Sequence, residues 1–207
     1  MGFYEKHIFS RAMDWAMGGL DTERQRVLGP ARGRVLEIGF GTGRNLPNYP
    51  PRVEHLTAFD PLDALQKRVE RRIAAAPFGV EWLHPTAEQQ LPFAAATFDT
   101  VVATFTLCSI PEPGQALEGL YRVLKPGGRF LFLEHGQAAS ARTSKWQRRL
   151  NPVQRRLACG CHLDRRPDQL IPEAGFAMEH HERWVHPKLG ALFGTLYEGR
   201  AIKAPAD

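Results

Sequence analysis

The chain has 207 residues, of which 43% are hydrophobic and 24% charged, and its formal net charge is +5. These values exclude a disordered chain, a collagen-like chain and a small disulfide-stabilised scaffold, and the length suits one domain with a single core. No apolar run approaches the roughly 20 residues that cross a bilayer, and the first residues lack the layout of a signal peptide. Because the cysteines number three (Cys108, Cys159 and Cys161), we expect free thiols in the reducing cytoplasm.

The N-terminal part of the chain predicts a helix, a first strand and a glycine-rich turn. Apolar side chains recur at helical spacing through residues 1–20, and this helix is expected to end at the glycine pair 18–19. A short apolar strand over residues 35–38 follows, and the glycines after it lead into a short helix. We expect the helix over 1–20 to act as a lid over a functional site.

Strand and helix then alternate through the centre of the chain. Further strands are predicted over residues 55–59, 80–83, 98–105 and 129–133. Helices are predicted over residues 62–75 and 115–124, and the Pro-Gly-Gly sequence at 126–128 reads as a helix stop followed by a turn. This alternation, at the spacing of β-α-β crossovers, predicts a doubly wound α/β fold with a mainly parallel sheet.

The C-terminal third completes the predicted fold. A basic segment is expected to form one or two helices, a helix over 167–174 ends at Gly175, and strands over 176–185 and 195–203 pair at the sheet edge. The prediction is therefore a seven-stranded sheet with an antiparallel edge strand, in a single domain over residues 1–207. Its parts are the lid helix (1–20), a ligand-binding core (34–134), a basic helical insertion (137–166), and a C-terminal helix with edge strands (167–207).

The turn after the first strand, residues 37–43 with the sequence EIGFGTG, is the main functional signal. Glycines at a strand end let the backbone approach a ligand, and they place the N–H groups of the following helix beside it. The dinucleotide pattern Gly-x-Gly-x-x-Gly fails because its third glycine falls on Arg44, and no Gly-Lys-Ser/Thr completes a phosphate-binding loop. A nucleotide-like ligand of another kind is indicated.

Asp60 closes the second predicted strand, where a carboxylate can accept hydrogen bonds from both hydroxyls of a ribose. An alternative is that Asp60 caps the helix expected to start near Pro61. Both interpretations stay open on the sequence alone.

Together with the turn, several later segments resemble the class I methyltransferases. Residues 86–93 (TAEQQLPF) are similar to the adenine-contacting loop of that family, with Thr86 where the family has an acid. Residues 98–102 and 122–128 resemble its fourth strand and the turn into its fifth, so the resemblance covers about 34–134 in order. It implies a Rossmann-like fold, S-adenosylmethionine as cofactor and S-adenosylhomocysteine as product. The cofactor-binding residues that it implies are Glu37, Gly39, Gly41, Gly43, Asn45, Asp60, Pro61, Thr86, Ala87, Glu88, Thr104 and Phe105.

Four shorter strings are similar to the methyltransferase-like thiol S-methyltransferases of animals. They are residues 43–50 (GRNLPNYP), 104–110 (TFTLCSI), 132–135 (FLEH) and 156–165 (RLACGCHLDR). The animal proteins carry an N-terminal membrane segment that is not found in this sequence, which is similar to a soluble bacterial-type relative. The resemblance implies methyl transfer to a small-molecule acceptor, with a thiol as one candidate beside amines, hydroxyls and activated carbon.

Candidate acceptor-side residues follow the fifth strand. His135 lies just past it, at the end of the sheet where such folds bind ligands, and a histidine suits acid–base chemistry near neutral pH. A purely structural hydrogen-bonding role for His135 is the alternative. Glu134 is expected to orient His135 or line the pocket, His162 is a second candidate, and the lid could contribute Tyr4 and His7.

A metal site is not expected. The CGCH sequence at 159–162 and the histidine pair 180–181 supply metal-binding residue types. Their spacing differs from the usual Cys-x-x-Cys pattern, and no second cysteine pair exists. Cys108, at the end of an apolar strand, is expected to be buried packing.

Two other functions remain in contention. Basic residues dominate segment 142–166, which could bind RNA, an anionic membrane surface or a phospholipid headgroup as substrate, or be a solvated face. The Asn/Asp-Pro-Pro-aromatic sequence of many amine-directed nucleic-acid methyltransferases is absent from residues 104–107, which disfavours a nucleic-acid substrate, and no DNA partner is expected. A protein that binds S-adenosylmethionine without catalysis is the other alternative, and the sequence indicates no oligomeric state.

Overall fold

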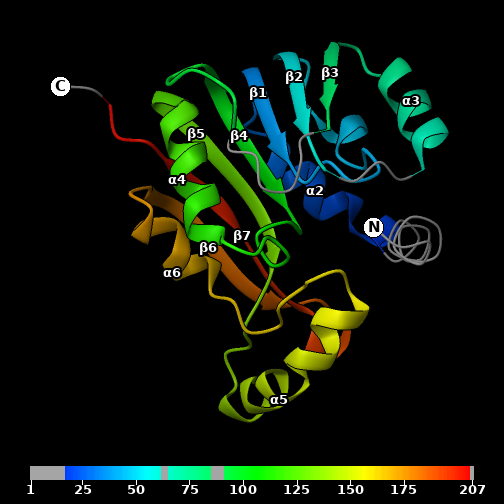
Figure 1. Cartoon of the computed structure of the whole chain (residues 1–207), viewed down its shortest axis with the longest axis vertical. Helices are drawn as coiled ribbons and strands as arrows, with labels where there is room; N and C mark the ends of the chain where they lie inside the picture. The colour runs from blue at the N-terminus through cyan, green and yellow to red at the C-terminus, as the bar shows by residue number, and fades with distance from the viewer. Residues whose placement is uncertain (1–16, 62–64, 85–90, 206–207) are drawn as a thin grey trace.

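The computed structural model describes residues 17–61, 65–84 and 91–205. Its strands form one seven-stranded sheet in the order β3-β2-β1-β4-β5-β7-β6 (Figure 1). The strands are β1 (Gly33–Ile38), β2 (Val53–Phe59), β3 (Gly79–Leu83), β4 (Phe98–Thr104), β5 (Leu124–His135), β6 (Ala177–Val185) and β7 (Thr195–Ile202). The helices are η2 (Met17–Leu20), α2 (Asp21–Leu28), η3 (Leu46–Asn48), α3 (Gln66–Ala74), α4 (Pro113–Val123), α5 (Ala141–Leu157), α6 (Pro167–Glu173) and α7 (Gly190–Phe193).

The predicted α/β fold with a mainly parallel sheet is confirmed. Strands β1 to β5 pair in parallel, and β7 runs antiparallel to both of its neighbours, β5 and β6. The antiparallel strand thus lies one place in from the edge, and β6 is the outermost strand.

Alternation along the central strands produces a core on each face of the sheet. In β5, Phe130 and Phe132 face one cluster, which includes Leu117 of α4. Leu131 faces the opposite cluster, which includes Leu28 of α2. Because successive side chains of a strand point to opposite faces, this central strand is buried on both sides.

Two local differences from the sequence prediction concern a helix and a turn. Helix α2 was not predicted, although Leu28 and Arg24 are buried and acidic residues occupy its first turn, the usual sign of a helix start. The Pro-Gly-Gly sequence at 126–128 lies within β5 as a bulge, because Leu124 pairs with Phe98 while Arg129 pairs with Thr100.

The lid helix predicted over residues 1–20 falls mostly outside the described residues, whose first element is η2. Among the described helices, none combines the length and the apolar character needed to span a bilayer. Figure 1 shows α5 beyond the end of β5, set apart from the sheet.

Close contact between β7 and its neighbours depends on Gly199. A Cβ there would collide with the His180 carbonyl oxygen and lie 2.7 Å from Cζ of Phe132. We expect Gly199→Ala to lower the free energy of unfolding by about 1–3 kcal/mol, since backbone and a packed ring must both move. Urea denaturation measures this loss. Gly114→Ala is the control, because no atom lies within 4 Å of its Cβ and alanine favours the helix by up to about 1 kcal/mol. Equal stability of the two variants would contradict the prediction.

Candidate functional site

The glycine turn after β1 packs against the turn after β4. Gly39, Gly41 and Gly43 all have positive φ angles, of 68°, 56° and 73°. A Cβ at Gly39 would lie 2.6 Å from Cβ of Thr106, so the close approach of the two turns requires glycine there. At Gly41 the nearest atom to a Cβ is the Gly39 carbonyl oxygen, 3.9 Å away. The turn is therefore packed at its first glycine and open at its second.

Asp60, at the end of β2, faces this turn. Its side chain is only 2% exposed, and Oδ2 accepts a hydrogen bond from the Gly41 N–H at 2.5 Å. Helix α3 begins at Gln66 with Leu65 as its N-cap residue, so Asp60 does not cap that helix. The carboxylate lies at the open part of the glycine turn. Pro61 follows it and is exposed.

A cluster of buried, hydrogen-bonded polar side chains connects the glycine turn to the neighbouring elements. Oγ1 of Thr104 accepts hydrogen bonds from Arg24 (3.2 Å) and from Asn45 (3.0 Å). The Asn45 amide also accepts from Arg24 at 2.5 Å and donates to Glu37 at 2.9 Å. The second oxygen of Glu37 accepts from the Tyr49 hydroxyl at 2.6 Å. These contacts join the end of β1, the start of η3, the end of β4 and helix α2.

Burial is the largest cause of the pKa shifts in this cluster. It raises the pKa of Glu37 to about 7, although the Tyr49 hydroxyl, Arg24 and Asn45 all oppose the shift. Burial likewise lowers the pKa of the Arg24 guanidinium. Nε of Arg24 is buried and has no hydrogen-bond partner within the described ranges. Arg24 thus presents an unused cationic donor close to the glycine turn.

A second buried carboxylate shapes the turn after β4. Glu134, fully buried at the end of β5, accepts the backbone N–H groups of Thr106, Leu107 and Cys108 at 3.0–3.2 Å. Burial raises its pKa to about 7 against the effect of these bonds. We expected Glu134 to orient His135 or line a pocket. The hydrogen bonds described for its carboxylate go to the β4 turn, in which Phe105 has a φ of 55°.

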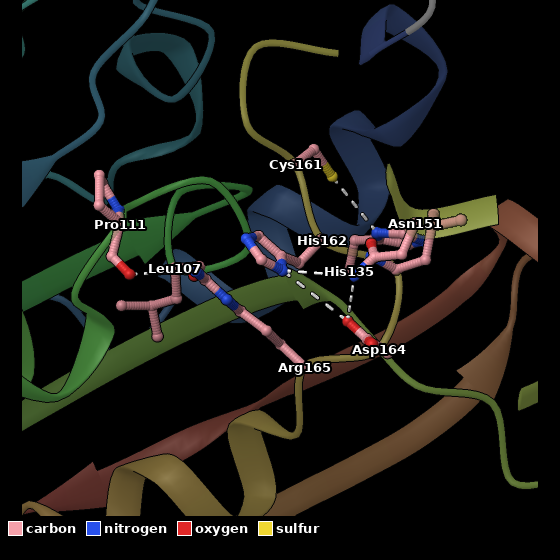
Figure 2. Close-up of polar contacts among 9 residues, drawn as sticks. Leu107, Pro111, His135, Asn151, Cys161, His162, Asp164 and Arg165 are labelled. Atoms are coloured by element: carbon pink, nitrogen blue, oxygen red, sulfur yellow. Dashed lines mark hydrogen bonds and ion pairs between the residues drawn. The ribbon is translucent and has the colours of Figure 1, made fainter. Parts of the chain in front are cut away.

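His135 lies beside the loop that follows α5, residues 158–165 (Figure 2). Its Nδ1 is 3.6 Å from Sγ of Cys161, while its buried Nε2 has no hydrogen-bond partner in the part of the chain that the structure describes. The hydrogen bond from Cys108 lowers the pKa of Cys161, and His135 adds to this shift. The pKa of the fully buried Cys108 is correspondingly raised. Of the two thiols, Cys161 is therefore the one that ionises more readily.

The same loop is tied to the β4 turn by its backbone and by one arginine. The His162 N–H donates to the Cys108 carbonyl at 2.8 Å, and the Arg165 guanidinium donates to the Leu107 carbonyl (Figure 2). The His162 ring lies 3.4 Å from the Asn151 amide and 3.8 Å from the Asp164 carboxylate. Its Nδ1 is thereby directed toward α5, whereas one nitrogen of His135 has no partner among the residues that the structure describes.

Other candidates lie outside the described residues: Tyr4, His7, Thr86, Ala87 and Glu88. The described ranges contain no group of three or more His, Cys, Asp or Glu residues arranged to hold a metal ion.

Four functional candidates were missed by the sequence reasoning. Arg24 belongs to a helix that was not predicted, whereas Tyr49 and Thr106 lie within the strings 43–50 and 104–110 but were given no role of their own. Cys161 was considered only as a metal ligand. The acidic first turn of α2 offered a signal for Arg24, whereas the contacts of Thr106 and Cys161 appear only after folding.

Comparison with known proteins places this arrangement in a family. Residues 36–132 match the model of a methyltransferase domain. Thiol S-methyltransferase TMT1B of Rattus norvegicus is 33% identical over 173 residues, which cover 82% of this chain and 70% of that protein. Thiol S-methyltransferase TMT1A of Homo sapiens is 32% identical over 200 residues, which cover 95% and 82%. Haemonchus contortus phosphoethanolamine N-methyltransferase 2, solved with S-adenosyl-L-methionine, has a TM-score of 0.70 at 15% identity, over 94% of this chain and 56% of that one.

The sheet order, the glycine turn and Asp60 are those of the class I S-adenosylmethionine-dependent methyltransferases. The chain belongs to this class, in the family that includes the thiol S-methyltransferases. It is an enzyme that transfers a methyl group from S-adenosylmethionine to a small-molecule acceptor. The site fits the cofactor, because open space borders Gly41 and a buried carboxylate stands at its edge.

The two buried glutamates make stability depend on pH. Between about pH 4.5 and 7 the folded chain keeps protons that the unfolded chain releases, so the free energy of unfolding falls as pH rises through this window. Each carboxyl contributes on the order of 1–3 kcal/mol. We expect Glu37→Gln to remove about half of this slope in urea titrations at several pH values. Glu118→Gln, an exposed position on α4, should leave the slope unchanged. An unaltered slope in Glu37→Gln would refute the assignment.

Proposed function

We propose that the acceptor is a small thiol, bound between the β4 turn and the loop over residues 158–165, with His135 as general base. The observation that carries this proposal is the His135 ring, whose Nδ1 faces Cys161 while its buried Nε2 has no hydrogen-bond partner among residues 17–61, 65–84 and 91–205. The thiol S-methyltransferases among the relatives support the choice of a thiol. The odd number of cysteines, Cys108, Cys159 and Cys161, supports a cytoplasmic location for the enzyme.

The cofactor supplies a methyl group already activated by its sulfonium sulfur, so the protein must mainly position the acceptor and remove its proton. In the proposed step the acceptor S–H gives its proton to Nε2 of His135. The acceptor sulfur then forms a bond to the methyl carbon as the bond between that carbon and the cofactor sulfur breaks. An acceptor that arrives as thiolate needs no base.

Cys161 acts as a positioning residue in this proposal. As a thiolate it accepts the Nδ1–H of His135, which keeps the lone pair of the imidazole on Nε2. Cys108 supports it by donating its own S–H to Cys161. The arrangement parallels a carboxylate that fixes the tautomer of a catalytic histidine, with sulfur in place of oxygen.

The proposed cofactor contacts are distributed over the turn and its supports. Gly39, Gly41 and Gly43 form the surface on which the methionine part lies, and Asp60 accepts from the ribose hydroxyls. Glu37, Asn45, Thr104 and Phe105 hold this surface in place, because the first three bond to one another around Arg24. The free Nε of Arg24 is suited to the carboxylate of the methionine part.

The role of Asp60 is tested by calorimetric titration with S-adenosylmethionine and S-adenosylhomocysteine. Asp60→Ala should weaken binding of both at least tenfold, or about 1.4 kcal/mol, because it removes two acceptors from the ribose. Asp99→Ala is the matched control, since Asp99 is an acid near the amino end of β4, paired with Lys125 away from the turn. Equal affinities of Asp60→Ala and wild type would contradict the role.

The base is tested with a series of thiols of increasing pKa. We expect His135→Gln to lower kcat by about 10²–10⁴-fold for thiols that are protonated at the assay pH. Thiols that are already ionised should be methylated at nearly the wild-type rate, a rescue that a purely structural role would not produce. A uniform loss across the series would refute general-base catalysis.

The positioning residue is tested with the same series. Cys161→Ala should reduce kcat about tenfold for the protonated thiols, because His135 loses the partner that selects its tautomer. Cys159→Ala, in the same loop, is the control and should retain activity. Equal losses of kcat in both variants would indicate disruption of the loop and would contradict the positioning role of Cys161.

A further inference from the structure

Helix α5 has an inverted distribution of polar and apolar side chains. Its buried residues are polar: Ser144, Gln147 and Asn151. Three of its four large apolar residues are exposed, Trp146 at 49%, Val153 at 56% and Leu157 at 59%, and the fourth, Leu150, is half-buried. A helix that packs on a core shows the reverse pattern. Spacings of seven and four residues place the three apolar side chains on one face, called the α5 apolar face below.

Polar contacts fix this orientation. The Gln147 side chain accepts from the Ala138 N–H at 2.8 Å and donates to the carbonyls of Gly136 (3.2 Å) and Leu192 (3.0 Å). Asn151 accepts from the Leu163 N–H at 2.9 Å and donates to Asp164 at 2.8 Å. Rotation of α5 to bury its apolar face would leave these buried backbone groups without partners, which is costly. The apolar face is therefore held toward solvent.

All the charged side chains of α5 are basic. The helix contains no Asp or Glu, and one of its arginines, Arg149, lies over the Trp146 ring at 5.4 Å. Its exposed basic residues are Arg142, Lys145, Arg148, Arg149, Arg155 and Arg156. Figure 1 shows that α5 stands away from the sheet, where it is accessible to a large surface.

We propose that the α5 apolar face docks onto an anionic phospholipid bilayer. Exposed aromatic and aliphatic side chains surrounded by Lys and Arg are the features of a helix that lies in the membrane interface. RNA would engage the arginines and Trp146 but would leave Val153 and Leu157 in water. A second copy of the chain would bring the same six positive charges against these, and so is disfavoured by repulsion.

Docking would also orient the acceptor side of the enzyme. The loop over 158–165 continues directly from α5, and Asn151 ties α5 to it through Leu163 and Asp164. Cys161, beside His135, is part of this loop. If the proposed thiol site is correct, bilayer docking brings it close to acceptors that partition into the membrane. The class of acceptor is then an apolar thiol.

Vesicle co-sedimentation tests the docking with neither cofactor nor thiol present, so its outcome is separate from that of the proposed catalysis. The full chain is mixed with vesicles of phosphatidylcholine, with or without phosphatidylserine. We expect binding to the anionic vesicles only. The double variant Val153→Ser/Leu157→Ser should bind them at least tenfold more weakly, because two apolar side chains no longer enter the interface.

The matched control exchanges the same two positions while keeping them apolar. Val153→Leu/Leu157→Val should bind as wild type does, and circular dichroism should show both double variants folded, since the positions are exposed. Absence of binding to anionic vesicles overturns the proposal. So does binding that salt abolishes but the serine variant leaves unchanged, which would indicate a purely electrostatic surface suited to nucleic acid.

Discussion

The buried carboxylate of Glu134 organises the functional end of the sheet. It accepts three successive backbone N–H groups of the turn after β4, groups that would otherwise be buried without partners. The turn held in this way places Thr106 against Gly39 and presents the Leu107 and Cys108 carbonyls to the loop over 158–165. The ends of β1, β4 and β5 and the loop after α5 therefore depend on one side chain.

Burial of ionisable side chains lowers the stability of the folded enzyme. Burial disfavours the ionised forms of Glu37, Glu134 and Arg24, as their shifted pKa values show. Such groups contribute little net stability compared with apolar packing. Their value lies in position, because each hydrogen bond fixes the geometry of a turn that meets the ligand. Glu37 lies at the end of β1, just before the glycine turn, and Glu134 holds the β4 turn that packs against it.

Helix α5 shows how one element can serve the site and an outer surface together. Its polar residues Gln147 and Asn151 secure the loop that carries Cys161, while its apolar residues are directed to solvent. A helix held by apolar packing could not present such a face. The acceptor side of the site is thus mechanically joined to the surface that we propose meets the membrane.

The sequence by itself determined the α/β class, the strand alternation, the glycine turn and the position of Asp60, because these depend on local periodicity and on glycine at positive φ. The tertiary structure alone decided what surrounds them. Arg24 meets Thr104, 80 residues away, and Glu134 meets Thr106, 28 residues away. The face of α5 that is buried was likewise set by backbone groups of Ala138 and Leu163. Partners distant in sequence leave no periodic signal, so only the folded chain shows which polar groups satisfy one another.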